Sequence, residues 1–243
     1  MIYTLREISG YYVKKISIYK AVKTYKDYIK ERINAYRIGI PIYLADLAIE
    51  MGTVYSIPSA KAHAATSVAL KRIMDNNEIP NLRLFQKGIY YLTQKTAFGE
   101  TRIDKDAIIR TKYMKDCNGY DFGAHALYKL GLTTQLPNQR EIVTNNSYEC
   151  RRKDKKLDVW VKPPKTVIDQ NNIDYLMILD IIDVLDKYPV DTDEPYRCIA
   201  KYISDKDLEY SILLAMADKY YNIDTIKKLA RVAGESGVGN EAA

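Results

Sequence analysis

The first 95 residues follow an order of secondary structure that few small folds share: three helical segments and then a hairpin. Apolar residues recur every three or four positions in each helical segment, the spacing of amphipathic helices. Two strand-like runs follow, joined at Gln86-Lys87-Gly88, where the glycine permits a tight turn. The five segments are 19–35, with Ser17 as expected N-cap, 43–52, 59–76, with Ser59 as expected N-cap, 82–85 and 89–92. This order predicts a winged helix-turn-helix, whose third helix enters the major groove of DNA.

The third segment has the composition expected of a helix that contacts DNA. Placing its apolar residues inward turns small and basic side chains outward, where the backbone can approach base edges and cations can meet phosphates. The inward residues are Ala62, Thr66, Ala69, Leu70 and Ile73. With the hairpin loop added, the predicted DNA-binding residues are Ser59, Lys61, Ala64, Ser67, Lys71, Arg72, Arg83, Gln86 and Lys87. The alternative is an ordinary solvated helix face, with His63 as a rim histidine because no second ligand stands at metal-binding spacing.

Charge is distributed unevenly along the chain. Lys and Arg outnumber Asp and Glu by 15 to 7 in residues 1–95 and by 14 to 9 in residues 96–165. In residues 166–243 the acidic residues outnumber the basic ones by 15 to 8. Such a division favours a polyanion, first of all nucleic acid, as the partner of the basic two-thirds, with the acidic end left for protein contacts or solvation. The alternative is that the surplus is ordinary surface charge that attracts no particular partner.

The pattern changes at Thr96, so we expect a DNA-binding domain over residues 1–95, with an added N-terminal helix, and a mixed α/β domain over 96–243 that is helical after about 172. The expected fold class is α+β and helix-rich. The second domain should hold a helix over 103–114, a turn over 118–121, a short helix ending at Gly131, a strand over 141–144, and basic strands over 148–153 and 156–161. Its candidate RNA-facing basic surface is Arg140, Arg151, Arg152, Lys153 and Lys156, with a solvated hairpin as the alternative.

Residues that could support catalysis have simpler explanations. Asp180, Asp183 and Asp186 are expected on the wet side of an amphipathic helix, and Asp154 in a turn of charges. His125 is expected to have a capping or core role, and no phosphate-binding loop or nucleophile elbow occurs. We therefore expect neither enzyme activity nor a cofactor or metal. No apolar run approaches the roughly 18 residues of a membrane span and no signal pattern occurs at the N-terminus, so a cytoplasmic protein is expected.

Two stretches resemble a known family. LFQKGIYYLTQKTAFGE (84–100) and GAHALYKLGLTTQLPNQREIVTN (123–145) are similar to the AbiEi-like antitoxins of type IV toxin–antitoxin systems, linked to abortive infection. The resemblance covers roughly residues 40–165 and is most specific over Gly131-Leu132-Thr133-Thr134-Gln135. The family's helix-turn-helix core corresponds to Ala69, Leu70, Ile73 and Gly88-Ile89-Tyr90, and its C-terminal signature to Gly123, Ala126, Leu130, Gly131 and Leu132.

The resemblance implies an antitoxin that counters a nucleotidyltransferase-like toxin, with or without a direct complex, and that represses its own operon by binding operator DNA, as a homodimer or by paired binding. Two alternatives stay open. One is a plain winged-helix regulator whose second domain binds an effector or a protein. The other is an antitoxin that binds protein alone and whose winged helix has lost its affinity for DNA.

Overall fold

The computed structural model describes residues 23–235, which form two compact units on either side of the Asp104–Lys105 bond. Helices and sheets occur in both, which confirms the α+β class. The boundary falls later than the predicted one at 95/96, because the segment after Leu92 folds back onto the first unit, called unit 1, which ends at Asp104. Thr101 N donates to Gln94 O (2.9 Å), and Asp104 N donates to Gly39 O (2.8 Å). No helix within the described residues is long and apolar enough to cross a bilayer.

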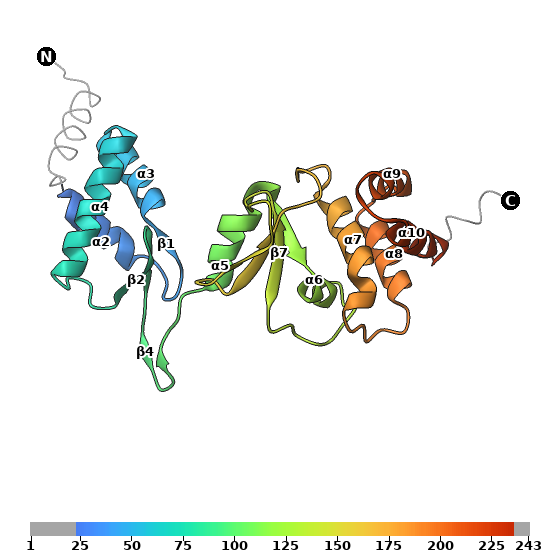
Figure 1. The fold of residues 1–243 in the computed structure, drawn as a ribbon. Helices are drawn as coiled ribbons and strands as arrows, with labels where there is room; N and C mark the ends of the chain where they lie inside the picture. Colours follow the sequence, from blue (N-terminus) through green and yellow to red (C-terminus); the bar gives the residue numbers. More distant parts are fainter. Residues whose placement is uncertain (1–22, 236–243) are drawn as a thin grey trace, which may run out of the picture. The chain divides into compact units, whose positions relative to one another are not determined.

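Unit 1 places three helices against a small antiparallel sheet (Figure 1). The elements are α2 (Tyr25–Asn34), β1 (Ile42–Tyr43), α3 (Leu44–Tyr55), α4 (Ser59–Asp75), β2 (Leu82–Gln86), β3 (Ile89–Leu92), β4 (Lys95–Thr96) and β5 (Gly99–Glu100). The sheet order is β1-β3-β2, and β4 and β5 form a separate hairpin. Three helices followed by a hairpin were predicted, whereas β1 was not.

The core of unit 1 explains the amphipathic pattern of its helices. Ile29 and Ile33 of α2, Met51 of α3 and Leu70 and Ile73 of α4 are fully buried. The buried residues of α4 are those predicted to face inward: Ala62, Thr66, Ala69, Leu70 and Ile73. The opposite face of α4 is therefore left to solvent.

The helix ends differ from the expected ones for local reasons. Thr24 caps α2, its Oγ1 accepting from Asp27 N (3.2 Å), while the expected start at residue 19 and the cap at Ser17 lie outside the described residues. Ser59 does not cap α4, because Pro58 holds the N-cap position. Gly52 does not end the second helix, because α3 continues to Tyr55.

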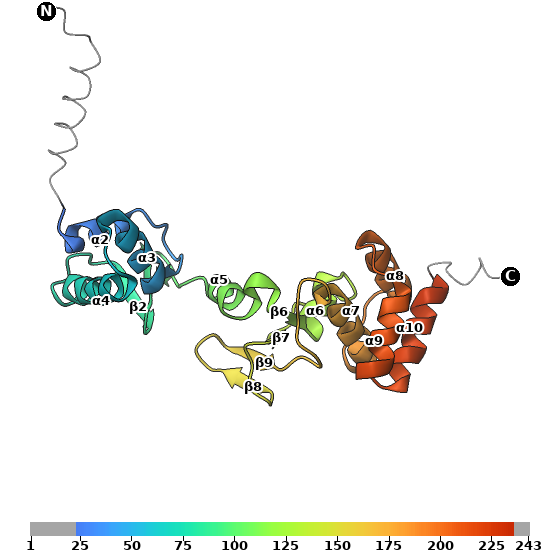
Figure 2. The ribbon, with the colours of Figure 1, turned by 90° about the horizontal axis from the view of Figure 1, so that it is seen from above.

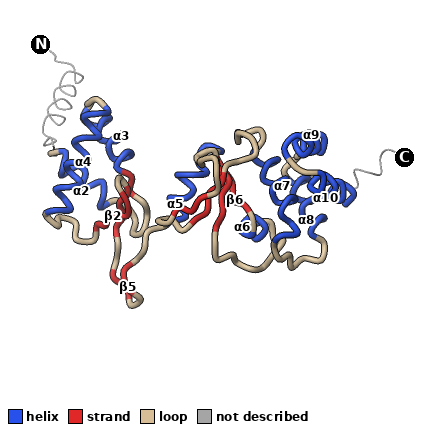
Figure 3. Tube along the Cα trace, in the orientation of Figure 1, coloured by secondary structure: helices blue, strands red, loops and turns tan. Residues whose placement is uncertain are grey.

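Unit 2 combines a four-stranded mixed sheet with a helical C-terminal part (Figures 2 and 3). Its elements are α5 (Lys105–Ile109), the π-helix η1 (Arg110–Met114), the 3-10 helix η2 (Lys115–Cys117), β6 (Gly119–Phe122), α6 (Ala124–Lys129), β7 (Arg140–Thr144), β8 (Arg152–Asp154), β9 (Val159–Lys162), α7 (Ile173–Val184), the 3-10 helix η3 (Leu185–Lys187), α8 (Pro195–Asp205), α9 (Tyr210–Tyr220) and α10 (Ile223–Glu235). The strand order is β6-β7-β9-β8, with β7 and β9 parallel. Helices after residue 172 were predicted.

Two predictions about the strands of unit 2 are wrong. The expected turn at 118–121 lies mostly in β6, a strand whose residues are all buried. Gly119 looks like a turn residue in the sequence but is needed for close packing, since a Cβ there would lie 2.4 Å from Tyr113 O and 2.6 Å from Val143 O. The expected strand over 148–153 begins only at Arg152 and includes Asp154, which was expected in a turn.

The prediction that Asp180, Asp183 and Asp186 all face water is wrong for Asp180. Its carboxylate is buried and accepts hydrogen bonds from the hydroxyls of Tyr120 (3.0 Å) and Tyr221 (2.9 Å). Burial raises the pKa of Asp180. Asp183 is half-buried, and only Asp186 is well exposed. Asp180 therefore links α7 to β6 of the sheet and to the loop between α9 and α10, and these hydrogen bonds compensate for its burial.

Candidate nucleic-acid interface

A cleft of about 530 Å³ lies between α4 and the β2–β3 turn of unit 1. It is lined by Tyr43, Leu44, Ala45, His63, Ser67, Leu84, Lys87, Gly88 and Tyr90. Leu44 N donates to Gly88 O (2.9 Å), which fixes the hairpin turn against the start of α3. Gly88 adopts φ +81°, a backbone conformation that residues other than glycine rarely adopt. The sides of the cleft are thus formed by helices, strands and a turn that is held in place by a hydrogen bond.

The outward side of α4 carries small residues and cations without acidic partners. Lys61, Lys71 and Arg72 are exposed, as is Lys87 on the hairpin turn, and none of the four has an ion-pair partner within residues 23–235. Ala64 and Ser67 lie between them and are exposed. We call Lys61, Ala64, Ser67, Lys71 and Arg72 the α4 surface. The one acidic residue of α4 is Asp75, at its C-terminal end.

The cations of α2 are, in contrast, held by carboxylates of unit 1. Lys26 and Lys30 donate to Glu78 Oε1 and Oε2, each at 2.9 Å, and Arg32 Nε donates to Glu50 Oε2 at 2.6 Å. Hydrogen bonds from the two lysines and Asn76 lower the pKa of Glu78 to about 2. Among the described helices of unit 1, the cations of α2 are therefore neutralised by carboxylates, whereas those of α4 stay available to an anion.

The hairpin residues predicted to bind DNA divide into two kinds. Lys87 is exposed on the turn, and Gln86 is half-buried at the end of β2. Arg83 is already engaged: its guanidinium donates to Pro80 O (2.8 Å), to Leu82 O (3.1 Å) and to Glu100 Oε1 (2.9 Å). Arg83 therefore ties β2 to the β4–β5 hairpin.

Two tyrosines of the cleft were missed in the sequence. Tyr43 and Tyr90 line it together with His63, the expected rim histidine. The Tyr43 hydroxyl is buried and finds no hydrogen-bond partner among the described residues. Burial raises the pKa of Tyr90. The sequence signal that could have placed Tyr43 in the cleft is the dipeptide Ile42-Tyr43 after Pro41. This dipeptide pairs with β3, but two residues are too few to be recognised as a strand.

The basic residues predicted to form one surface in unit 2 do not do so. Arg140 is largely buried, with Nε 2.6 Å from Asp121 Oδ1 and Nη1 3.0 Å from Asp106 Oδ1. Arg140 is turned toward the protein because it neutralises the carboxylates of Asp121 and Asp106. Arg151 pairs with Glu141 (2.8 Å) and Lys153 with Asp158 (2.7 Å), while Arg152 lies over the Tyr148 ring. Lys156 is exposed and has no ion pair within the described part of the chain.

Asp121 gathers several cations around one buried carboxylate. Besides Arg140, it accepts a hydrogen bond from Lys129, and His125 Nδ1 near the start of α6 lies 3.3 Å from its Oδ1. Burial alone would raise the pKa of Asp121, but the side chains of His125, Arg140 and Lys129 around the carboxylate outweigh it and hold the pKa well below its usual range.

The positions that carry the antitoxin resemblance in unit 2 are structural. Gly131 ends α6 at φ +73°, Gly131 N donates to Tyr128 O, and Leu132 N donates to Leu127 O, both at 3.0 Å. This is a Schellman cap, with Leu132 fully buried behind it. Asp191 accepts from Thr133 Oγ1 (3.1 Å) and from Thr134 N (2.8 Å). The segment 131–134 thus ends one helix and fastens the loop before α8.

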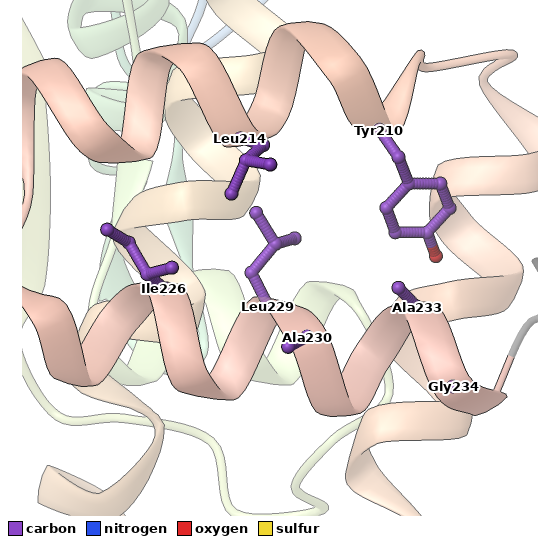
Figure 4. Close-up of a pocket in the computed structure, with 7 residues that line it drawn as sticks. All are labelled: Tyr210, Leu214, Ile226, Leu229, Ala230, Ala233 and Gly234. Atoms are coloured by element: carbon purple, nitrogen blue, oxygen red, sulfur yellow. The ribbon is translucent and has the colours of Figure 1, made fainter. Parts of the chain in front are cut away.

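An apolar groove of about 370 Å³ lies between α9 and α10 (Figure 4). Its lining is Tyr210, Leu214, Ile226, Leu229, Ala230, Ala233 and Gly234. Hydrocarbon side chains dominate this surface, and no Lys or Arg is among the described residues that line it. It is therefore distinct in chemistry from the α4 surface.

Sequence comparison adds no assignment to this geometry. No family model matches the chain, and no curated protein is significantly similar to it. The resemblance to AbiEi-like antitoxins stays a prediction.

Proposed function

We propose that unit 1 is a winged helix-turn-helix domain that binds duplex DNA and that the protein represses transcription of its own operon. The observation that carries the proposal is the α4 surface, where the exposed cations of one helix have no acidic partner between residues 23 and 235 while the opposite face of the helix is buried. The order α2-β1-α3-α4-β2-β3 and the sheet order β1-β3-β2 support it. α3 and α4 are joined by residues 56–58, the short turn of a helix-turn-helix.

The dimensions of α4 determine how it would dock. Its 17 residues extend roughly 26 Å at 1.5 Å per residue, about twice the width of the major groove of B-DNA. The N-terminal half, with Ala64 and Ser67 outward, would approach the base edges. Lys61, Lys71 and Arg72 would neutralise phosphates on the flanks, and Lys87 would contact the backbone beyond the cleft.

For unit 2 we propose the antitoxin role that the family resemblance implies, opposing a nucleotidyltransferase-like toxin. A plain regulator is the second candidate, and the groove between α9 and α10 favours it, because an apolar effector or the apolar face of a partner helix would fit there. Co-expression with the product of the neighbouring gene distinguishes them. Relief of growth arrest by this chain supports an antitoxin, and no relief supports the plain regulator.

Binding to DNA from upstream of its own gene tests the proposal for unit 1. Fluorescence anisotropy should detect tighter binding to this duplex than to one of shuffled sequence, with affinity falling as salt rises because phosphate contacts release counterions. Lys87→Ala should flatten the plot of log affinity against log salt by about one unit. Arg83→Ala is the matched control and should leave the slope unchanged, since Arg83 is bound to Glu100. Equal affinity for both duplexes would contradict a repressor.

A further inference from the structure

Unit 2 contains a second pocket, of about 310 Å³, on one face of its sheet. Strand register places Phe122 of β6 opposite Glu141 of β7, Glu141 opposite Trp160 of β9, and Trp160 opposite Lys153 of β8, so these four side chains form a row across one face. The pocket is lined by Phe122, Ala124, Pro137, Asn138, Gln139, Glu141, Arg151, Trp160 and Tyr188. Its volume lies at the lower end of the roughly 300–1,000 Å³ of small-molecule sites.

One wall of the pocket is a stack of Arg151 on Trp160. The guanidinium carbon of Arg151 lies 3.9 Å from the centroid of the indole ring, and its Nε donates to Glu141 Oε1 (2.8 Å). Trp160 Nε1 donates to Gln139 Oε1 (3.0 Å). Both flat groups are therefore held in place by hydrogen bonds at their edges, and the charge of Arg151 is balanced by Glu141.

Another wall is formed by the ring of Tyr188, which packs on the backbone before α6. Gly123 adopts φ +63°, and a Cβ there would lie 2.7 Å from the Tyr188 hydroxyl oxygen. Any other residue at 123 would displace the ring, so the glycine keeps this wall in position. Burial and the Glu141 carboxylate raise the pKa of Tyr188, which keeps its hydroxyl protonated and able to donate.

We propose that this pocket binds an unpaired nucleobase. A base is flat and uncharged, and it is polar at its edges. The walls of the pocket are aromatic rings and the guanidinium of Arg151, whose charge is balanced by Glu141. The amides of Asn138 and Gln139 at the rim can form hydrogen bonds with the edge of a base. Lys155 and Lys156 follow β8 on the turn to β9, where they are exposed and have no ion pair among the described residues. They would meet the phosphates of a strand whose base occupies the pocket.

The chain provides its own reporter of this site, because Trp160 is its single tryptophan. A base that stacks in the pocket should quench Trp160 fluorescence. The full-length protein would be titrated with single-stranded RNA of about 12 nucleotides, with DNA of the same sequence, with the corresponding duplex DNA, and with the four ribonucleoside monophosphates. We expect saturable quenching by a single strand and none by the duplex, which keeps this outcome separate from duplex binding by unit 1. Quenching by a monophosphate at the same affinity would identify the ligand as a free nucleotide.

Two variants connect the signal to the pocket. Tyr188→Leu removes a ring on which a base stacks and should weaken binding about tenfold. Tyr148→Leu is the matched control, since Tyr148 is an exposed tyrosine that packs with Arg152 outside the pocket, and it should leave affinity unchanged. Asn138→Ala changes an exposed loop residue and leaves the Gln139–Trp160 hydrogen bond in place, and it should weaken binding roughly threefold to tenfold without affecting folding. No quenching by any single strand or monophosphate, or equal losses in Tyr188→Leu and Tyr148→Leu, would overturn the proposal.

Discussion

Replacing Lys61 and Lys71 together by alanine should lower the affinity for operator DNA about 60-fold at 0.1 M salt. Each phosphate contact contributes roughly 0.9 to the slope of log affinity against log salt, so two lost contacts flatten the slope by about 1.8. At 0.1 M salt, a slope change of about 1.8 corresponds to an affinity lower by a factor of about 60 than that of the native protein. Both lysines are exposed and have no ion-pair partner within residues 23–235, so neither substitution exposes a buried charge. Anisotropy titrations at several salt concentrations measure the slope and the affinity together.

The matched control removes the same charge from another helix of unit 1. Lys30→Ala with Arg32→Ala also lowers the net charge by two, but these side chains are paired with Glu78 and Glu50. Their loss should leave the slope nearly unchanged. If both double variants flatten the slope equally, the effect is one of total charge, and the assignment of α4 as the helix that binds DNA is wrong.

The α4 surface could be predicted from the sequence because helical periodicity is local. A residue's face follows from its spacing to neighbours three and four positions away, so the inward set from Ala62 to Ile73 and the outward lysines follow from the sequence alone. β1 could not be predicted in the same way. It has two residues, and only its pairing with β3, almost 50 positions later, makes it a strand.

The errors in unit 2 come from partners that lie far away in the sequence. Asp180 has the spacing of a solvated residue, yet Tyr120 and Tyr221 supply the hydrogen bonds that permit its burial. Arg140 looks like part of a basic strand, and only the position of Asp121 on the neighbouring strand makes it an internal cation. Charge counts along a chain predict which regions are basic, but they do not predict which cations stay unpaired after folding.

The carboxylate of Asp121 should matter more for stability than any other group in this charge cluster. Its side chain is about 4% exposed and accepts a hydrogen bond from Arg140 Nε at 2.6 Å, and Arg140 is itself only 12% exposed. Removing one member of a buried ion pair leaves the other charged and desolvated, which typically costs about 3–5 kcal/mol. Asp121→Ala should therefore lower the free energy of unfolding of unit 2 by about that amount, measured by urea denaturation.

Asp106→Ala is the control, because Asp106 pairs with the same Arg140 but its side chain is 66% exposed, and its loss should cost less than about 1 kcal/mol.

The pH dependence of the stability difference between the native protein and Asp121→Ala separates the effect of charge pairing from that of packing. Since the folded-state pKa of Asp121 lies below its ordinary value, its stabilising effect is complete above about pH 4 and declines as the pH falls through the folded-state pKa. The difference between the native protein and Asp121→Ala should shrink on acidification. A difference that stays constant from pH 7 to about pH 3 would mean that Asp121 stabilises unit 2 through its shape and not through its charge.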